Sequence, residues 1–176
     1  MYILIPAERI RTRVGELACQ IAQDYQDLYP LTIVGVLTGS LMFLVDLVRH
    51  LDLPLRIGFI QASSYRGPTT TPGLVRLSTD LTPDVRNRHV LLLDDILDSG
   101  QTLTCVIEHV RNLGCQSLRT AVLLRKQGRT HPLVPDYCGF DIPNVFVVGY
   151  GLDFNDEYRH LPDIAVLPTT ASGESL

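Results

Sequence analysis

Short apolar runs alternate with amphipathic segments along this chain, and this alternation constrains its fold more than any other feature. Five runs that are rich in β-branched residues and too short for helices predict strands at Ile33–Leu37, Leu55–Ile60, Val90–Leu93, Leu118–Leu124 and Val145–Gly149. Helical spacing of apolar residues predicts helices over Ala7–Tyr29, Leu41–Leu51 and Thr102–Leu113. Strands that alternate with helices favour an α/β fold, a mostly parallel sheet flanked by helices that binds ligands beyond the carboxyl ends of its strands.

Length and charge limit what such a chain can do. The 176 residues predict one domain over 1–168, followed by a flexible tail over 169–176. A net charge of −4 provides no basic excess, so we expect no nucleic-acid partner and no membrane partner. The amino-terminal residues lack the pattern of a signal peptide, and the four cysteines lack metal-binding spacing; both features favour a cytoplasmic protein with buried thiols.

The most informative segment is 90–103, in which an apolar run is followed by Asp94 and Asp95 and then by a turn of small residues that opens a helix. Successive strand side chains point to opposite faces, so we expect both carboxylates at a strand end, where the backbone leaves the sheet. Two adjacent carboxylates repel each other, and a cation or ribose hydroxyls would relieve that cost. A sugar-bound Mg²⁺ meets both needs.

The turn that follows has the composition of a phosphate-binding loop. Asp98, Ser99, Gly100, Gln101 and Thr102 supply hydroxyls and backbone N–H groups at a helix N-terminus, where donors and the helix dipole both favour an anion. The alternative is that Asp98 or Ser99 only caps the helix. The chain has neither the glycine fingerprint of dinucleotide-binding folds nor the phosphate loop of nucleoside triphosphatases, so another mode of phosphate binding is expected.

Segment 90–102 resembles the phosphoribosyl-pyrophosphate motif of the type I phosphoribosyltransferases, which is an apolar run, two acids and a D-[TS]-G-x-T loop. Four further segments are similar to those of the hypoxanthine-guanine phosphoribosyltransferases: the pyrophosphate loop, the mobile catalytic loop, the strand end with the purine-binding lysine, and the purine segment. In this chain they are Thr38-Gly39-Ser40, a loop that includes Ser64 and Tyr65, Lys126, and 146–162. The resemblance implies a small hood over the base site.

The resemblance also implies an activity. It is transfer of 5-phosphoribosyl from phosphoribosyl pyrophosphate to N9 of hypoxanthine or guanine, which gives IMP or GMP and requires Mg²⁺. Asp94 and Asp95 would hold the ribose and the metal, and Ser99, Gly100, Gln101 and Thr102 would hold the 5-phosphate. Asp98 would also bind there and act as the acid/base group near the purine N7. The partners expected are small-molecule substrates and further copies of this chain, as a homodimer or homotetramer.

On the purine side, the resemblance assigns Lys126 to the purine O6, an acceptor that adenine lacks. Phe146 would stack on the base, and the backbone of Val145 and Val147 would meet its edge. Asp153 would contact a second metal ion or the base edge, and Arg159 the pyrophosphate together with Thr38, Gly39 and Ser40. The alternatives are an Asx turn for Asp153 and a surface ion pair for Arg159.

Some positions depart from the family pattern. Many relatives carry a basic residue where this chain has Thr38 and a lysine where it has Gln101, so positive charge is lost at both loops. Counting back from Pro135 aligns the relatives' lysine with Arg125 unless one residue is deleted after Lys126, and both alignments stay open. Two other functions also stay open: an enzyme of this fold acting on xanthine or uracil, and a nucleotide-sensing regulator that binds RNA or DNA.

Overall fold

The computed structural model describes residues 1–64, 75–77, 83–128 and 133–168. Tyr65, predicted in the mobile loop, and the tail over 169–176 lie outside these residues. The helices are α1 (Ala7–Tyr25), α2 (Leu41–Arg49) and α3 (Gln101–Asn112). The strands are β1 (Tyr2–Ile5), β2 (Leu31–Leu37), β3 (Leu55–Ser64), β4 (Val75–Leu77), β5 (His89–Leu97), β6 (Ser117–Lys126), β7 (Tyr137–Ile142), β8 (Val147–Val148) and β9 (Ile164–Val166).

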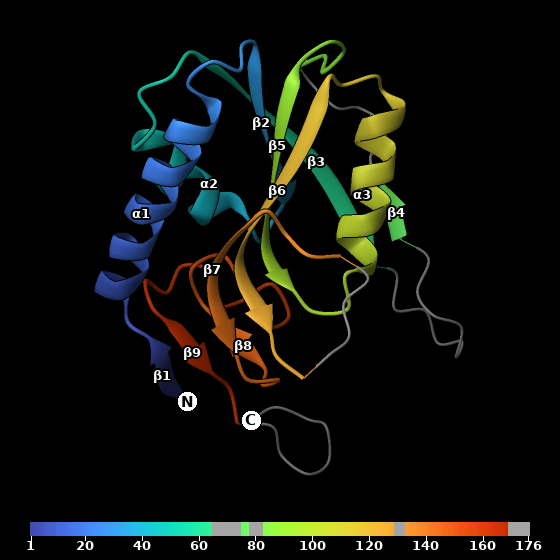
Figure 1. Cartoon of the computed structure of the whole chain (residues 1–176). Helices are drawn as coiled ribbons and strands as arrows, with labels where there is room; N and C mark the ends of the chain where they lie inside the picture. The colour runs from blue at the N-terminus through green and yellow to red at the C-terminus, as the bar shows by residue number, and fades with distance from the viewer. Residues whose placement is uncertain (65–74, 78–82, 129–132, 169–176) are drawn as a thin grey trace.

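The larger sheet has the strand order β4-β3-β2-β5-β6-β7. Five of these strands are parallel, and β4 pairs antiparallel with β3. Helices α1 and α2 cover one face and α3 covers the other (Figure 1). The α/β class predicted from the alternation of strands and helices is confirmed.

The two faces of this sheet carry separate apolar clusters, because successive strand residues point to opposite sides. Leu91 and Leu93 pack with the apolar faces of α1 and α2. Val90 and Leu92 pack with the buried residues of α3. All four side chains have no exposed surface, so β5 is the centre of both clusters.

A second sheet of order β1-β9-β8 is antiparallel and joins the two ends of the chain. The predicted strand at 145–149 was expected to follow the others in the parallel sheet, and this was wrong: only Val147–Val148 is a strand, and it pairs with β9. The fifth parallel strand is β7, whose Gly139 and Asp141 interrupt its apolar pattern. The small sheet lies below the carboxyl ends of the parallel strands in Figure 1, where the predicted hood belongs.

Helix boundaries differ from the predictions where proline and glycine act on the backbone. Helix α1 ends at Tyr25 rather than Tyr29. Tyr29 itself precedes Pro30, and a residue before proline is disfavoured in helical conformation. Helix α3 begins at Gln101, directly after Gly100, which has a φ of 78°. None of the described helices is long and apolar enough to span a membrane.

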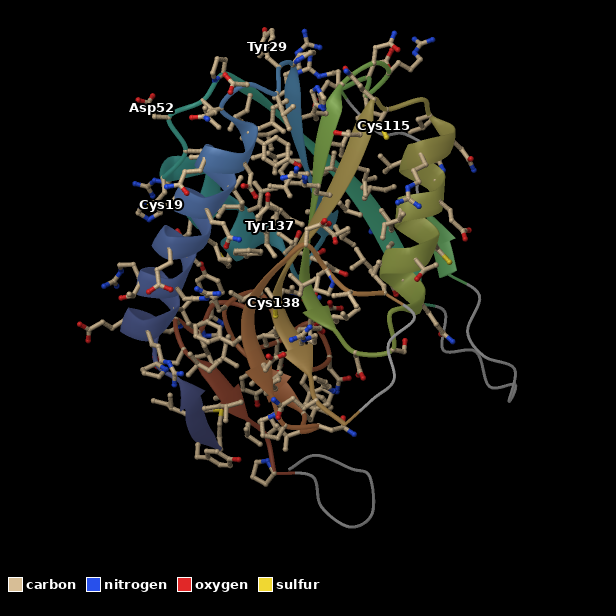
Figure 2. All side chains as sticks on the ribbon, in the orientation of Figure 1. Cys19, Tyr29, Asp52, Cys115, Tyr137 and Cys138 are labelled. Atoms are coloured by element: carbon tan, nitrogen blue, oxygen red, sulfur yellow. The ribbon has the colours of Figure 1, made fainter. Side chains whose placement is uncertain are left out.

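The cysteines lie in separate parts of the fold, as the labels of Cys19, Cys115 and Cys138 in Figure 2 show. All four are free thiols, but the prediction that they are buried was wrong. Cys19 is exposed on α1, and the other three are partly buried. Burial raises the pKa of the Cys115 and Cys138 thiols, which keeps them in the less reactive protonated form.

Candidate active site

The order of the strands creates a place for a ligand between β2 and β5. From β2 the chain passes to β3 on one side, and it later enters β5 on the other side. The loops that leave the carboxyl ends of β2 and β5 therefore diverge, which is the usual binding position in open α/β sheets. A cavity of about 640 Å³ lies there, and its lining includes residues of both loops.

Asp94 and Asp95 lie on β5 beyond its pairing with β2. The β2–β5 ladder ends at Gly35 and Leu93, whereas the β5–β6 ladder continues to Leu97 and Arg125. The expectation that both acids follow the strand was therefore wrong in detail. Strand β5 continues through both acids, because it stays paired with β6 after its pairing with β2 has ended. Both side chains line the cavity, and their contact with a ligand stays a prediction.

Burial dominates the electrostatics of this pair. It raises the pKa of Asp94 well above its ordinary value, and the neighbouring Asp95 charge raises that pKa further. Burial also raises the pKa of Asp95, although hydrogen bonds from Asp94 and from the Ile96 N–H and the charge of Arg159 oppose this rise. Two desolvated carboxylates side by side favour a bound cation or hydroxyl donors.

The loop over 38–40 lies against Asp95. A Cβ at Gly39 would lie 1.6 Å from the Asp95 Oδ2, so only glycine fits while that side chain holds its position. The Leu37–Thr38 peptide is cis. Thr38 and Gly39 line the cavity, but Ser40 does not. The Ser40 side chain is fully buried and its hydroxyl donates to the Val36 carbonyl at 2.6 Å, so this hydroxyl does not face the cavity, and the contact of Ser40 with the pyrophosphate stays a prediction.

The opposite wall of the cavity is the turn that opens α3. Gly100 holds a left-handed conformation at the N-cap of α3, and no side chain caps this helix. The interaction that comes nearest to a cap is long: the Gln101 N–H donates to the Ser99 Oγ at 3.4 Å. Ser99, Gly100 and Thr102 line the cavity together with Asp98, whereas the exposed Gln101 does not. The first-turn N–H groups therefore remain available for an anion.

Arg159 closes the third side and is already held by its neighbours. Its Nη1 lies 2.9 Å from Asp153 Oδ1 and donates to the Gly151 carbonyl at 2.8 Å. Its Nη2 donates to Asp156 Oδ1 at 3.0 Å. Asp153 also accepts from the Asp156 N–H at 2.9 Å, a bond that spans three residues rather than the two of an Asx turn. The ion-pair alternative for Arg159 is therefore present in the structure, and Asp153 bonds the backbone of its own turn over a longer span than the expected Asx turn.

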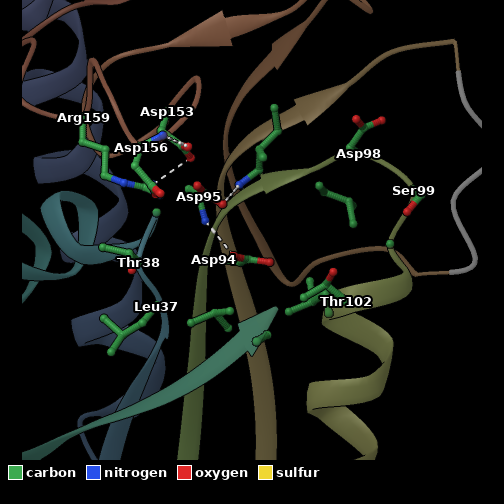
Figure 3. A pocket seen from close by; sticks show the side chains of 17 residues that line it. Leu37, Thr38, Asp94, Asp95, Asp98, Ser99, Thr102, Asp153, Asp156 and Arg159 are labelled. Carbon is green, nitrogen blue, oxygen red and sulfur yellow. Dashed lines mark hydrogen bonds and ion pairs between the residues drawn. The ribbon is translucent and has the colours of Figure 1, made fainter. Parts of the chain in front are cut away.

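A second cavity of about 530 Å³ adjoins the first, and the two share Asp95, Ile96, Asp98, Asp153 and Asp156 as lining residues. Its other lining residues include the predicted purine contacts Lys126, Phe146 and Val147, but not Val145. The Lys126 Nζ donates to Asp98 Oδ2 at 3.0 Å. Figure 3 shows Asp98, Ser99 and Thr102 on one side of the first cavity and Thr38, Asp153 and Arg159 on the other.

Arg125 and Lys126 point to different surroundings, which bears on the alignment left open above. Arg125 makes a bidentate pair with Asp141 of β7, at 2.6 Å and 3.0 Å. Arg125 does not line either cavity, whereas Lys126 is 9% exposed and lines the second. The surroundings of the two side chains favour Lys126 as the purine-contacting residue.

Several lining residues had no predicted role, and two of them make contacts that shape the site. The ring of Phe154 packs edge to face on Phe146, with 5.7 Å between the centroids, and lines the second cavity. Asp156 lines both cavities and holds Arg159. The only sequence signal for these two residues was their position within segment 146–162. The turns in this segment show neither the periodicity of a strand nor that of a helix.

Comparisons with known proteins agree with this geometry. The family model described as the phosphoribosyl transferase domain matches residues 6–155. A hypoxanthine-guanine phosphoribosyltransferase of Bacillus subtilis is 42% identical over 166 residues, which cover 94% of this chain and 92% of that protein. The chain belongs to the hypoxanthine-guanine phosphoribosyltransferase family. It is therefore a phosphoribosyltransferase enzyme, as predicted.

Solved structures of this family match the fold closely. A hypoxanthine phosphoribosyltransferase of Staphylococcus aureus has a TM-score of 0.87 and 40% identity, covering 94% of this chain and 90% of that one. A hypoxanthine phosphoribosyl transferase of Trypanosoma cruzi has a TM-score of 0.86 and 44% identity at the same coverage. The type I phosphoribosyltransferase fold is thereby confirmed.

Proposed function

We propose that this phosphoribosyltransferase transfers the 5-phosphoribosyl group of phosphoribosyl pyrophosphate to N9 of hypoxanthine or guanine. The observation that carries the proposal is the pair of adjoining cavities that share Asp95 and Asp98. One cavity has the helix N-terminus and small-residue loops that suit phosphates, and the other has the lysine and aromatic rings that suit a purine. The donor and the acceptor would meet at the shared carboxylates.

In this reaction the bond between C1′ and the pyrophosphate oxygen breaks, and a bond from N9 to C1′ forms. The base loses one proton, and pyrophosphate leaves with the bonding electron pair. The turn that opens α3 would hold the 5-phosphate through its N–H groups and the Ser99 and Thr102 hydroxyls. Thr38, Gly39 and Arg159 would face the pyrophosphate, with Arg159 held in place by Asp153 and Asp156.

Asp98 is the proposed acid/base group. Its carboxylate lies 3.0 Å from the Lys126 Nζ and lines both cavities, so one side chain could reach the base and the ribose. It would take or share the purine proton as the glycosidic bond forms. Lys126 would donate to the O6 of the base, which selects 6-oxopurines over adenine.

The donor set of this site fits Mg²⁺. Among the described residues that line the first cavity, five carboxylates face one arginine, which would repel a pyrophosphate that arrived without a cation. Among the described residues, no group of three or more His, Cys, Asp or Glu side chains is placed so that it could hold a metal ion on its own. Asp94 and Asp95 would hold the metal together with substrate oxygens, the mode typical of Mg²⁺, and Asp153 would hold a second ion. The metal would neutralise charge on the leaving pyrophosphate.

The base assay tests this proposal first. Purified protein is incubated with phosphoribosyl pyrophosphate and Mg²⁺ and offered hypoxanthine, guanine, xanthine, adenine or uracil separately. We expect IMP or GMP to form and adenine to give no product. Turnover of xanthine or uracil alone would reassign the base, and salt-dependent RNA binding without any turnover would favour the regulator.

An Asp98→Asn variant tests the acid/base role. Since the amide cannot accept a proton, we expect turnover to fall by roughly 100-fold or more, as is typical when general acid/base catalysis is lost. Binding of phosphoribosyl pyrophosphate should change little. An Asp98→Asn enzyme with wild-type turnover would remove Asp98 from this role.

The homodimer or homotetramer implied by the resemblance is also part of the proposal. Exposed apolar side chains of α2 and β3, namely Met42, Val45, Ile57 and Phe59, support a contact between copies of the chain. Light scattering behind size-exclusion chromatography measures the mass directly. A mass of one chain, 19.6 kDa, at all concentrations would contradict it.

A further inference from the structure

One hydrogen bond joins α2 to the turn that precedes Arg159. The Tyr150 hydroxyl donates to Asp46 Oδ2 at 2.7 Å, between residues 104 positions apart. Tyr150 is 8% exposed, and burial together with this bond raises the pKa of its hydroxyl, which stays protonated as a donor. Neither residue lines the two cavities of the active site, and no role was predicted for either.

The backbone of Tyr150 is held in a conformation that few tyrosines adopt. Its φ is 51°, and it lies between Gly149 and Gly151, whose φ values are 96° and 99°. The Tyr150 N–H donates to the Leu161 carbonyl at 2.7 Å, and the Gly149 N–H donates to the Leu152 carbonyl at 2.9 Å. Left-handed backbone at a bulky residue persists only where its surroundings over-determine it, and the bond to Asp46 is one such restraint.

This turn touches both groups that face the leaving pyrophosphate. A Cβ on Gly151 would lie 2.1 Å from the Gly39 carbonyl oxygen, so the two backbones are in direct contact. The Gly151 carbonyl accepts from the Arg159 Nη1 at 2.8 Å. A shift of the turn would therefore move the 38–40 loop and Arg159 together.

Asp46 is connected through helix α2 to the 38–40 loop, which is the other partner in the Gly151–Gly39 contact. Helix α2 begins at Leu41, directly after the 38–40 loop, and carries Asp46 one and a half turns further on. The loop, the helix, the Asp46–Tyr150 bond and the Gly151–Gly39 contact thus form a closed circuit. Within this circuit, the Asp46–Tyr150 bond is the side-chain link that holds the two backbone segments against each other, beside the Gly151–Gly39 contact.

We propose that Asp46 and Tyr150 are positioning residues for the pyrophosphate half of the site. This inference rests on the proposed function, since it assumes that the 38–40 loop and Arg159 meet the pyrophosphate group. The bond holds both in register before substrate arrives, so its loss weakens donor binding more than it slows the chemical step.

The test uses Tyr150→Phe, which removes only the hydroxyl, and Tyr137→Phe as a matched control. Tyr137, labelled in Figure 2, is also buried and donates to Asp24 at 2.7 Å on α1, away from both cavities. We expect Tyr150→Phe to raise KM and Kd for phosphoribosyl pyrophosphate by about 5- to 20-fold, an effect at or below the lower end of the range for a hydrogen bond to a charged acceptor. Its kcat should change less than about twofold. Tyr137→Phe should lose similar stability in urea and leave KM unchanged.

Two further variants separate positioning from general stability. Asp46→Asn keeps an acceptor oxygen and should restore KM to within about twofold of wild type, whereas Asp46→Ala should match Tyr150→Phe. The Asp46→Ala/Tyr150→Phe double variant should be no worse than either single one, because both remove the same bond.

The outcomes distinguish this inference from the proposed function. If wild-type protein turns over hypoxanthine or guanine while Tyr150→Phe has an unchanged KM, or one shifted only as in Tyr137→Phe, the positioning role is overturned and the function stands. Additive effects of the two substitutions would overturn it as well. Wild-type protein that neither binds phosphoribosyl pyrophosphate nor turns over any base would overturn both.

Discussion

Replacing Gly151 by alanine would test the contact between the turn over 149–152 and the 38–40 loop. The new Cβ would lie 2.1 Å from the Gly39 carbonyl oxygen and 3.2 Å from the Gly39 carbonyl carbon. Both are backbone atoms, so no rotamer change relieves the overlap. Gly151 also has a φ of 99°, where any residue with a Cβ is strained.

Two other glycines separate these contributions. Gly128 has a φ of 78° and nothing within 4 Å of a Cβ, so Gly128→Ala carries the conformational cost alone, about 1–2 kcal/mol. Gly15, inside α1, has open space and an ordinary φ, and Gly15→Ala should gain about 0.5–1 kcal/mol. Gly151→Ala adds an overpacking cost of about 1–3 kcal/mol to its conformational cost, which gives a loss of roughly 2–5 kcal/mol.

Urea unfolding measures all three, with the free energy of unfolding taken from the midpoint and slope. We expect the stability order Gly15→Ala, wild type, Gly128→Ala, Gly151→Ala. The Gly151→Ala enzyme should also have a higher KM for phosphoribosyl pyrophosphate than Gly15→Ala, because the displaced loop carries Thr38. Equal stability of the Gly151→Ala and Gly128→Ala proteins would refute the reasoning, since the Gly39 contact would then contribute nothing.

Three further predictions concern the base, a surface ion pair and the metal. Lys126→Ala should raise KM for hypoxanthine at least about tenfold, whereas Arg125→Ala should leave this KM within about twofold of wild type. Equal effects of the two substitutions would contradict the choice of Lys126 over Arg125 as the purine contact. The Arg125 guanidinium lowers the pKa of Asp141, so Arg125→Ala should cost about 0.3–1 kcal/mol at pH 7 for this half-exposed pair. That stabilisation is complete above the unfolded pKa of about 3.9 and is lost as pH falls through the lower folded value, so urea curves should show an equal effect at pH 7 and pH 5 and a smaller one at pH 3. Chelation by EDTA should abolish turnover and added Mg²⁺ should restore it; turnover in EDTA would contradict the metal requirement.

The central strands were predictable because they are buried on both faces. Residues Val90–Leu93 of β5 are apolar without a break, as a strand covered by helices on both sides requires. Strands β1, β4, β7 and β9 were not predicted. Strands β1 and β7 carry exposed or polar residues that dilute the apolar pattern, and β4 and β9 have only three residues each. Tyr2 and Ile3 of β1, for example, are 58% exposed, and only their pairing with β9 defines the strand.

The site residues also divide into some that could be predicted from the sequence and some that could not. Asp94, Asp95 and Lys126 were placed together by topology, because the carboxyl ends of neighbouring parallel strands meet at one edge. Ser40 and Val145 were carried over with their motifs and do not line either cavity. The roles of Tyr150 and Asp46 could not be read from the sequence, because their bond depends on a left-handed turn and on residues 104 positions apart.

Pairing of the first strand with the last has a consequence for how the enzyme is made. Tyr2 of β1 pairs with Val166 of β9, and β9 in turn pairs with Val147. While the ribosome is still synthesising the chain, the parallel strands through β6 can emerge and pack in order. The small sheet cannot form until residue 166 has left the ribosome. Asp153 and Asp156, which line both cavities, and Arg159, which lines the phosphate cavity, all lie in the segment between β8 and β9. Both cavities therefore mature late, and a nascent chain that stops short of β9 would lack the sheet that flanks this segment.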